Sequence, residues 1–215
     1  ATGQGTIAME IVQELPTVDY ILVPIGGGGL VSGVATLAKM LNPKIKVIGV
    51  EPAEAASMKA ALAAGEVVQL ESANTIADGT AVKAVGATGN RREKMYRVLL
   101  VEDDELIGAF LDMVENHKMI VENSGLLSVA ALKQLDCKGK KVVCVLSGGN
   151  MDVITMSSIV QHGLIQRDRI FSVSVLLPDK PGELVQVAQT IAEAQGNVIK
   201  LEHNQFVSTN RNAAV

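Results

Sequence analysis

Uninterrupted apolar runs of strand length alternate with segments of helical spacing over the first 165 residues of the chain. The apolar runs predict strands over Tyr20–Ile25, Ile45–Val50, Val98–Val101 and Lys141–Leu146. The segments between and after them predict helices over Leu30–Leu41, Ala53–Ala64, 103–117, Ser124–Leu135 and Asp152–Gln161, with Ser124 as the candidate cap of the fourth. Strands that alternate with helices predict an α/β fold with a doubly wound, mainly parallel sheet. Apolar runs without alternating polar positions are typical of strands that helices cover on both faces.

The pattern changes near the carboxyl end of the chain. Phe171–Leu177 has a period of two and predicts a strand, Glu183–Ala194 predicts a helix, and Val198–Leu201 predicts a short second strand. We therefore expect two domains, residues 1–165 and a smaller βαβ unit over residues 170–215. One helix and two strands cannot cover both faces of a sheet, so we expect this unit to be the first part of a larger domain.

Composition narrows the classes of partner. The chain has 48% hydrophobic residues but no Trp, three Phe and two Tyr, so it lacks the stacking platforms of single-stranded nucleic-acid binders. Nineteen basic and twenty-three acidic residues give a net charge of −4 without a basic patch, which argues against nucleic acid and anionic membranes as partners. The uncharged stretch Tyr20–Ala38 approaches transmembrane length, but Pro24 and four glycines interrupt it, so we expect a strand, a loop and a helix.

Cysteine and histidine are too few and too scattered to build a metal or disulfide framework. Cys137 and Cys144 are the only cysteines, and the three histidines lie at positions 117, 162 and 203. No metal-ligand spacing results, so no metal site is expected. The small number of cysteines is typical of a protein in a reducing cytoplasm.

Four consecutive glycines follow the first predicted strand and precede the first predicted helix. Because these residues lack Cβ atoms, their backbone N–H groups can approach an anion closely. The following helix adds the positive end of its dipole. The sequence therefore predicts a phosphate-binding loop made of Gly26, Gly27, Gly28, Gly29 and Leu30.

Two familiar phosphate motifs do not fit this loop. A P-loop requires Gly-Lys-Ser or Gly-Lys-Thr, and here the glycines are followed by Leu30 and Val31. The dinucleotide fingerprint requires glycines at positions i, i+2 and i+5, a spacing that no start within the loop satisfies. Glu51, however, ends the next strand where a ribose-binding acid would lie, so a nucleotide-binding domain stays as an alternative at this point.

A second glycine turn follows the strand predicted over Lys141–Leu146. It consists of Ser147, Gly148, Gly149 and Asn150. Loops at the carboxyl ends of parallel strands face the same crevice, so the two glycine turns can hold opposite ends of one flat, phosphorylated cofactor. Taken alone, this motif also fits an ordinary strand-to-helix turn.

Several separated motifs resemble, in the same order, the serine/threonine dehydratases. These motifs are Thr2–Ile7, the loop Gly26–Gly29, the segment Thr75–Gly79 and the turn Ser147–Asn150. The resemblance runs from residue 1 to about residue 165 and is strongest to the threonine ammonia-lyases, which are pyridoxal-phosphate enzymes of the tryptophan-synthase β fold type. It implies that the protein binds pyridoxal 5′-phosphate and converts threonine or serine into 2-oxobutyrate or pyruvate plus ammonia by β-elimination.

The resemblance also implies roles for residues of the two turns. It implies that Gly26–Gly29 and Leu30 hold the cofactor phosphate. It implies that Ser147 faces the pyridine nitrogen and that Gly148 and Asn150 shape the turn beneath the ring. A serine hydroxyl donates a hydrogen bond to that nitrogen without protonating it, whereas a carboxylate would stabilise a pyridinium. An unprotonated ring is a weaker electron sink, which favours β-elimination over transamination.

Two acidic residues match positions of the same family. Glu122 matches a Glu-x-x-Gly segment beside the cofactor, although its neighbours differ from the commoner small-residue run, and a plain first-turn helix acid is the alternative. Glu51 matches a carboxylate that in some relatives binds a cation together with a carbonyl near Ala55. Ser57 replaces the second carboxylate of that site, so we favour a solvated acid after a strand and assign no metal.

Family members carry the catalytic lysine, and the loop that binds the substrate carboxylate, in an amino-terminal region before the part resembled here. None of the thirteen lysines of this chain stands in the family's lysine motif, so no catalytic residue is assigned. The chain also lacks an initiator Met. We therefore expect a piece of a longer protein that is inactive by itself.

The segment Pro178–Leu184 resembles the start of an ACT regulatory domain, and its unit corresponds to the first half of one. This resemblance implies a nucleotide or amino-acid effector and assembly into a homo-oligomer. Two alternatives to the dehydratase stay open. One is another enzyme of the same fold type, such as a serine racemase, and the other is a nucleotide- or amino-acid-sensing module without catalysis.

Overall fold

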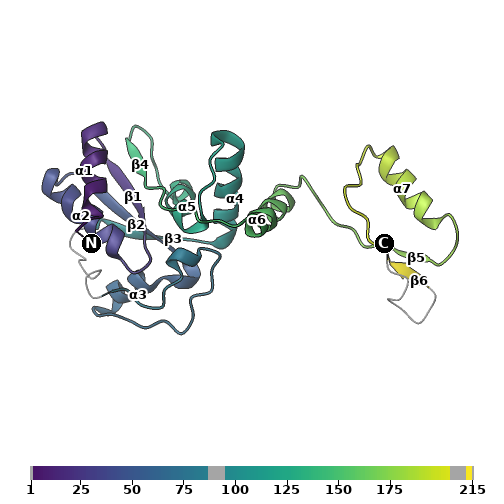
Figure 1. The fold of residues 1–215 in the computed structure, drawn as a ribbon, viewed down its shortest axis with the longest axis horizontal. Helices are drawn as coiled ribbons and strands as arrows, with labels where there is room; N and C mark the ends of the chain where they lie inside the picture. The colour runs from purple at the N-terminus through teal and green to yellow at the C-terminus, as the bar shows by residue number, and fades with distance from the viewer. Residues whose placement is uncertain (1, 87–94, 204–211, 215) are drawn as a thin grey trace. The chain divides into compact units, whose positions relative to one another are not determined.

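The sheet expected from the apolar runs is present (Figure 1). The computed structural model describes residues 2–86, 95–203 and 212–214. Four strands in the first two of these ranges form one sheet: β1 (Tyr20–Pro24), β2 (Lys46–Pro52), β3 (Arg97–Val101) and β4 (Val142–Cys144). Their spatial order is β3-β2-β1-β4, and every pairing is parallel. The predicted parallel sheet is therefore confirmed, and each strand overlaps the apolar run that predicted it.

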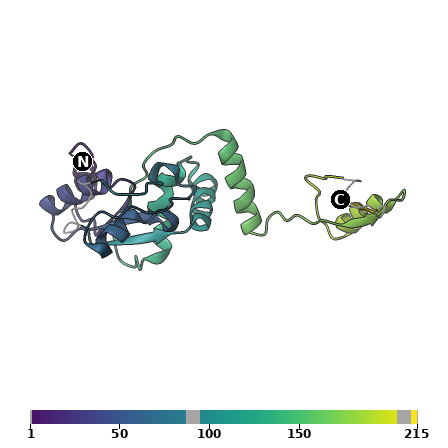
Figure 2. The same ribbon diagram turned by 90° about the horizontal axis from the view of Figure 1, so that it is seen from below.

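Helices cover both faces of this sheet, and Figure 2 gives a second view of them. One face carries α1 (Gly5–Glu14), α2 (Gly29–Leu41) and α3 (Ser57–Ala64). The other carries α4 (Asp103–Asp112), α5 (Asn123–Ala130) and α6 (Val153–Gln166). Successive residues of a strand point to opposite faces, so Ile21 and Val23 pack against the first set of helices and Leu22 against the second. The sheet is therefore doubly wound, as predicted.

Short irregular turns complete this unit. They are the 3-10 turns η1 (Ala53–Ala55), η2 (Asp78–Thr80) and η6 (Ala131–Gln134) and the π-turn η5 (Met113–His117). The turn η5 continues α4, so the helix predicted over 103–117 ends in a looser turn, and η6 continues α5 in a tighter one.

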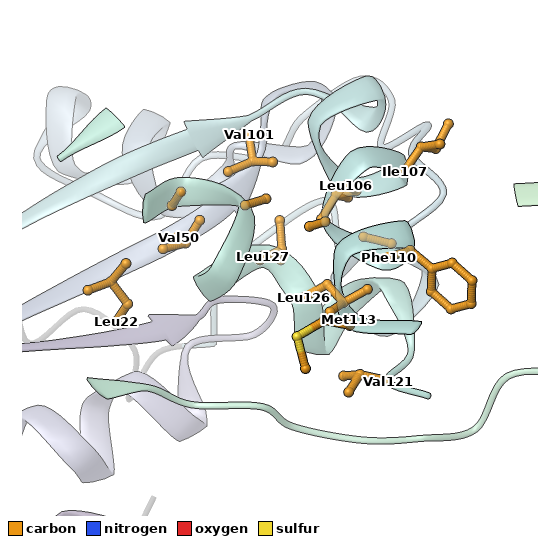
Figure 3. Close-up of a cluster of buried hydrophobic side chains, with 14 of the residues drawn as sticks. Leu22, Val50, Val101, Leu106, Ile107, Phe110, Met113, Val121, Leu126 and Leu127 are labelled. Atoms are coloured by element: carbon orange, nitrogen blue, oxygen red, sulfur yellow. The ribbon is translucent and has the colours of Figure 1, made fainter. Parts of the chain in front are cut away.

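The face covered by α4, α5 and α6 encloses an aliphatic core (Figure 3). Leu22 and Val50 reach this core from the strands, and both are fully buried. Leu106 and Phe110 of α4 meet them from the helix side and are also fully buried. Phe110 is the one aromatic residue among the labelled side chains. The others are Leu, Ile, Val and Met113, as the aromatic-poor composition predicts.

Helix α1 lies outside the elements predicted above. Its residues Ile7 and Ile11, and Leu15 just after it, recur every four positions, and they pack against the core that α2 also covers. Ala8, in the same helix, is fully buried. The apolar spacing of this segment was therefore a usable helix signal.

The start of α5 corrects one prediction. The residue before the helix is Glu122, and Ser124 already lies inside it, so the predicted Ser124 cap is wrong. The Ser124 hydroxyl instead lies 3.5 Å from the Thr80 hydroxyl, in a buried contact with η2. The Ser124 side chain therefore makes a tertiary contact with Thr80 instead of the helix cap that the local pattern predicted.

Residues Arg167–Val215 form a second compact unit, which contains β5 (Leu176–Pro178), α7 (Glu183–Glu193) and β6 (Asn212–Ala214). The helix agrees with the prediction, but only the end of the run Phe171–Leu177 is a strand. The predicted strand over Val198–Leu201 is wrong. Strand β6 supplies the antiparallel partner of β5, so 198–201 pairs with no strand of the described residues.

No helix within the described ranges is both long enough and apolar enough to cross a membrane. The uncharged stretch Tyr20–Ala38 instead forms β1, a glycine loop and most of α2. Pro24 ends the strand, and the glycines separate it from the helix, as the sequence predicts.

Leu106→Ala tests the core of the first unit. Leu106 is fully buried, so the substitution should lower the free energy of unfolding by about 2–5 kcal/mol. Leu41→Ala is the matched control, because Leu41 ends α2 with 48% of its surface exposed, and it should cost no more than about 0.5–1 kcal/mol. Urea unfolding followed by circular dichroism measures both, and equal losses would contradict the buried position of Leu106.

Candidate functional site

The two glycine turns follow neighbouring strands of the sheet. The loop Gly26–Gly29 follows β1, the turn Ser147–Asn150 follows β4, and these strands pair in parallel. From β1 the chain proceeds to β2 and β3 on one side, and it returns to the other side of β1 for β4. Such a reversal of strand order is the switch point at which open parallel sheets bind ligands. The sheet therefore brings both turns to the carboxyl ends of its two switch-point strands.

The first turn leaves backbone groups accessible at the start of α2. The helix begins at Gly29, one residue before the predicted start, and no side chain caps it. Gly28, the residue before the helix, has a φ of 84°, a left-handed conformation that glycine adopts without strain. A Cβ at Gly27 or Gly29 would meet no atom within 4 Å. Open space thus lies over an uncapped helix N-terminus, which is a fitting place for a phosphate.

The glycine loop packs against the segment around η2. A Cβ at Gly26 would lie 3.1 Å from the Gly79 carbonyl oxygen and 3.2 Å from the Thr80 Cα, so the absence of a side chain permits this contact. The Gly86 N–H also donates a hydrogen bond to the Gly27 carbonyl oxygen (3.0 Å). Gly26 therefore acts in packing, whereas Gly27 and Gly29 face open space.

Asp103 fixes the segment Thr75–Gly79 from the start of α4. Its carboxylate accepts hydrogen bonds from the Thr75 hydroxyl (2.5 Å) and from the Ile76 N–H (3.0 Å). The Asn123 side-chain amide donates to the Ile76 carbonyl oxygen (3.0 Å). Sequence reasoning misses these contacts, because Asp103 and Asn123 lie 27 and 47 positions from Ile76 and carry no local motif.

The second turn packs against the first turn of α5. Gly148 has a φ of +94°, which only glycine adopts readily. Gly125 lies so close that a Cβ there would come 2.5 Å from the Ser147 carbonyl oxygen. The Glu122 carboxylate accepts a hydrogen bond from the Asn150 N–H (3.1 Å). Glu122 therefore contacts the turn and is not a plain first-turn helix acid.

A small pocket of about 60 Å³ joins η2, the start of α5 and the second turn. Its lining includes Gly79, Glu122, Ser124 and Asn150. Of the residues that the resemblance assigns to the ring end of the cofactor, Asn150 lines this pocket. Ser147 is half-buried and is not among the lining residues. Gly79 lies between the glycine loop and the start of α5: a Cβ at Gly26 would come 3.1 Å from its carbonyl oxygen, and a Cβ at Gly79 itself would come 3.5 Å from Glu122 Oε1.

Glu51 is fully buried at the end of β2, where the sequence suggested a solvated acid. Its carboxylate accepts hydrogen bonds from the backbone N–H groups of Met58 (2.7 Å) and Lys59 (2.9 Å), at the start of α3. Burial raises the pKa of Glu51 to about 7, against the lowering effect of these hydrogen bonds. The carboxylate therefore caps a helix, and the solvated-acid interpretation is wrong.

The side chains around this carboxylate differ from those of the cation site that the resemblance suggests. Within the described ranges, no group of three or more His, Cys, Asp or Glu side chains is placed to hold a metal ion. At the position of the second family carboxylate, Ser57 is fully buried and supplies a neutral hydroxyl. A second carboxylate is therefore missing at this position. The N-terminus of α3, which carries the positive end of the helix dipole, is the partner of Glu51.

The fold and the turns define an α/β domain of the class that binds phosphorylated ligands at a switch point. The chain belongs to the family of pyridoxal-phosphate dependent enzymes, because the model of that family matches residues 1–148. The loop residues fit the cofactor's phosphate, since they combine open backbone with an uncapped helix N-terminus.

The relatives that match this chain include threonine ammonia-lyases and serine racemases. The chain is 44% identical over 208 residues to an L-threonine ammonia-lyase of Geobacter sulfurreducens, a match that covers 94% of this chain and 52% of the relative. It resembles the structure of threonine deaminase isoform 2 from Solanum lycopersicum with 35% identity and a TM-score of 0.69, over 74% of this chain and 48% of that one. A serine racemase from Dictyostelium discoideum matches with 38% identity and a TM-score of 0.64, over 70% and 50%. The chain spans about half the length of the curated relatives it matches.

Lowering the pH should stabilise the fold through Glu51. The folded pKa of about 7 exceeds the ordinary value of 4.5, so between these values the folded chain binds more protons than the unfolded chain. Linkage then makes stability rise as the pH falls through this window, by at most about 3 kcal/mol for this group, and makes it fall as the pH rises towards 7.

Glu51→Gln removes this titration and isolates its effect. Urea unfolding at pH 5 and pH 7.5 should give a smaller gain on acidification for the variant than for the native chain. The variant should also be less stable at both pH values, because the Gln side-chain NH2 replaces one of the two accepting oxygens and cannot accept its helix N–H. An identical pH dependence in the two proteins would contradict the role assigned to Glu51.

Proposed function

We propose that the whole protein is a pyridoxal-phosphate dependent lyase that converts threonine, and serine, into 2-oxobutyrate or pyruvate plus ammonia. The observation that carries this proposal is the uncapped start of α2 behind open glycines at the switch point of the sheet. The identity of 44% to a threonine ammonia-lyase supports the choice of reaction. We therefore propose threonine or serine as the amino-acid substrate of the whole protein.

The phosphate end of the cofactor is assigned to Gly26, Gly27, Gly28, Gly29 and Leu30. Backbone N–H groups of the first turn of α2 bind the phosphate oxygens, because no side chain competes for them and the helix dipole is positive there. Gly26 holds the loop down on the segment around η2, which limits the motion of the phosphate.

The ring end of the cofactor is assigned to Ser147, Gly148 and Asn150. The Ser147 hydroxyl donates a neutral hydrogen bond to the pyridine nitrogen, while Gly148 and Asn150 shape the turn that carries it. When bound, pyridoxal phosphate supplies an electron sink for the pair of electrons left when the substrate loses its Cα proton. With Ser147 as a neutral hydrogen-bond partner, the ring nitrogen would stay unprotonated and the ring would be a weaker electron sink, which would favour β-elimination over transamination.

No lysine of this chain is assigned as the catalytic amine. The thirteen lysines lie outside the family's lysine motif, and Lys39 lies in the last turn of α2, away from the glycine loop. Covalent catalysis requires an amine held beside the aldehyde carbon of the cofactor. We therefore infer that these 215 residues bind cofactor without turning over threonine.

Serine racemase is a second candidate function, because two serine racemase structures match this chain with TM-scores of 0.64 and 0.67. The two functions differ in product. The whole protein supplied with L-threonine forms 2-oxobutyrate if it is a dehydratase, and supplied with L-serine forms D-serine if it is a racemase. Comparing the two rates decides between them.

For the second unit we propose an effector-binding role. A turn over 178–182 precedes α7, with Gly182 at a φ of +98° directly before the helix. Backbone N–H groups at this helix start can meet an amino acid or nucleotide. Assembly into a homo-oligomer and a cytoplasmic location stay predictions from the sequence.

The phosphate loop can be tested with Gly27→Asp. Gly27 is exposed and has no neighbour within 4 Å, so the substitution adds a negative charge without a clash. Repulsion should weaken binding of pyridoxal phosphate by at least about tenfold. Gly27→Asn, which has the same shape and no charge, is the matched control and should retain most of the affinity. Binding is measured by ³¹P NMR titration, and equal affinities of the two variants would exclude this loop.

The ring end can be tested with Ser147→Ala. Loss of one neutral hydrogen bond costs about 1 kcal/mol, so the chain should keep its cofactor within about tenfold of the native affinity. The ¹⁵N resonance of labelled pyridine nitrogen should move towards its value in free cofactor, while the ³¹P resonance stays. In the whole protein the same variant should eliminate more slowly. Full activity with an unmoved ¹⁵N resonance would remove Ser147 from the site.

A further inference from the structure

The Glu122 side chain makes contacts that local helix stability does not explain. Glu122 occupies the position before α5, where a carboxylate commonly accepts N–H groups of its own helix. Here the side chain makes no such capping bond. Its backbone carbonyl alone serves the helix, accepting from the N–H groups of Gly125 (2.9 Å) and Leu126 (3.2 Å). The carboxylate is therefore directed to another segment of the chain.

That segment is the turn Ser147–Asn150, which Glu122 contacts at its second and fourth residues. Oε2 accepts the Asn150 N–H at 3.1 Å, and the Glu122 N–H donates to the Gly148 carbonyl oxygen at 3.4 Å. The carboxylate also fills the space that a Cβ at Gly148 would need, with Oε2 only 2.8 Å from that position. Glu122 is half-buried, whereas Gly148 and Asn150 on the turn are exposed.

The same helix turn also fixes the residue at the start of this turn. Because Gly125 lacks a side chain, the Ser147 carbonyl oxygen can lie against the backbone of α5. The turn is thus held from one helix at its first residue by Gly125 and at its later residues by Glu122. With the backbone fixed on both sides, the direction of the Ser147 Cα–Cβ bond is fixed too.

We propose that Glu122 is a positioning residue that clamps the turn Ser147–Asn150 and thereby aims the Ser147 hydroxyl at the cofactor ring. This inference rests on the proposed function, because it takes pyridoxal phosphate as the ligand. It assigns Glu122 a geometric role through hydrogen-bond acceptance and space filling, rather than a role as a charge beside the ring. The phosphate loop follows β1 instead, and none of the Glu122 contacts named above involves it.

The test follows both ends of bound pyridoxal phosphate labelled with ¹⁵N at the ring nitrogen. In Glu122→Ala, the ¹⁵N resonance of the bound cofactor should move towards the free value, as in Ser147→Ala, while the ³¹P resonance stays in its native position. Glu122→Gln retains an acceptor oxygen and nearly the same volume, so it should keep the native ¹⁵N resonance. A Gln variant that behaves like the Ala variant would overturn the geometric role.

Glu102→Ala is the matched control for a general loosening of the fold. Glu102 occupies the equivalent position before α4, where it caps its own helix and lies in no part of the site. This variant should leave both resonances of the bound cofactor unchanged. A shift in Glu102→Ala equal to that in Glu122→Ala, or an unmoved ¹⁵N resonance in Glu122→Ala, would overturn the proposal. Absence of ³¹P binding to the native chain would instead overturn the proposed function, and the inference with it.

A second measurement needs no cofactor. Gly148→Ala creates a clash with the Glu122 carboxylate in addition to strain at positive φ. Gly148→Ala should therefore lower the urea concentration at the midpoint of unfolding by less in the Glu122→Ala background than in the native background. Equal losses in both backgrounds would show that Glu122 does not clamp the turn, even if the chain binds pyridoxal phosphate.

Discussion

The parallel pairing of β1 with both β2 and β4 is the interaction on which the site depends. β4 follows β1 by more than a hundred residues, yet Tyr20 lies opposite both Lys46 and Val142. This register sets the ends of β1 and β4 side by side and with them the two glycine turns. A shift of β4 by one residue would turn its side chains to the opposite faces and would move the Ser147 turn away from α5.

Glycine serves two different physical purposes around these turns. At Gly27 and Gly29 the missing side chain leaves the backbone open to a ligand, whereas at Gly26 and Gly125 it lets two backbone segments touch. Gly148 combines a left-handed backbone with close contact to Glu122. The glycine pattern therefore encodes both the opening of the site and the rigidity of its walls.

The sequence predicts the parts of this fold that local pattern determines. Four apolar runs predict the strands of the parallel sheet, and the glycine loop follows from composition and position alone. The role of Glu51 could not be predicted in this way, because its partners Met58 and Lys59 are backbone groups that the fold brings to it. The false strand over Val198–Leu201 has the same origin, since a short strand exists only where another strand offers hydrogen bonds.

The candidate site divides in the same manner. Both glycine turns are visible as motifs, and the resemblance to dehydratases adds roles to them. Asp103 and Gly125 were not assigned, because each acts on a segment more than twenty positions away. Resemblance marked Glu122 as a family position, but only its contacts with Gly148 and Asn150 define what it does.

The two turns of the site differ in their electrostatic potential. The glycine loop, to which we assign the phosphate, lies at the positive end of α2, whose first turn has no acidic residue. The pocket at the other end is lined by the carboxyl groups of Asp78, Glu122 and Asp152, and hydrogen bonds from Thr155 lower the pKa of Asp152. An anionic phosphate is therefore attracted to one turn and repelled from the other, so the site favours one orientation of a flat ligand before any specific contact forms.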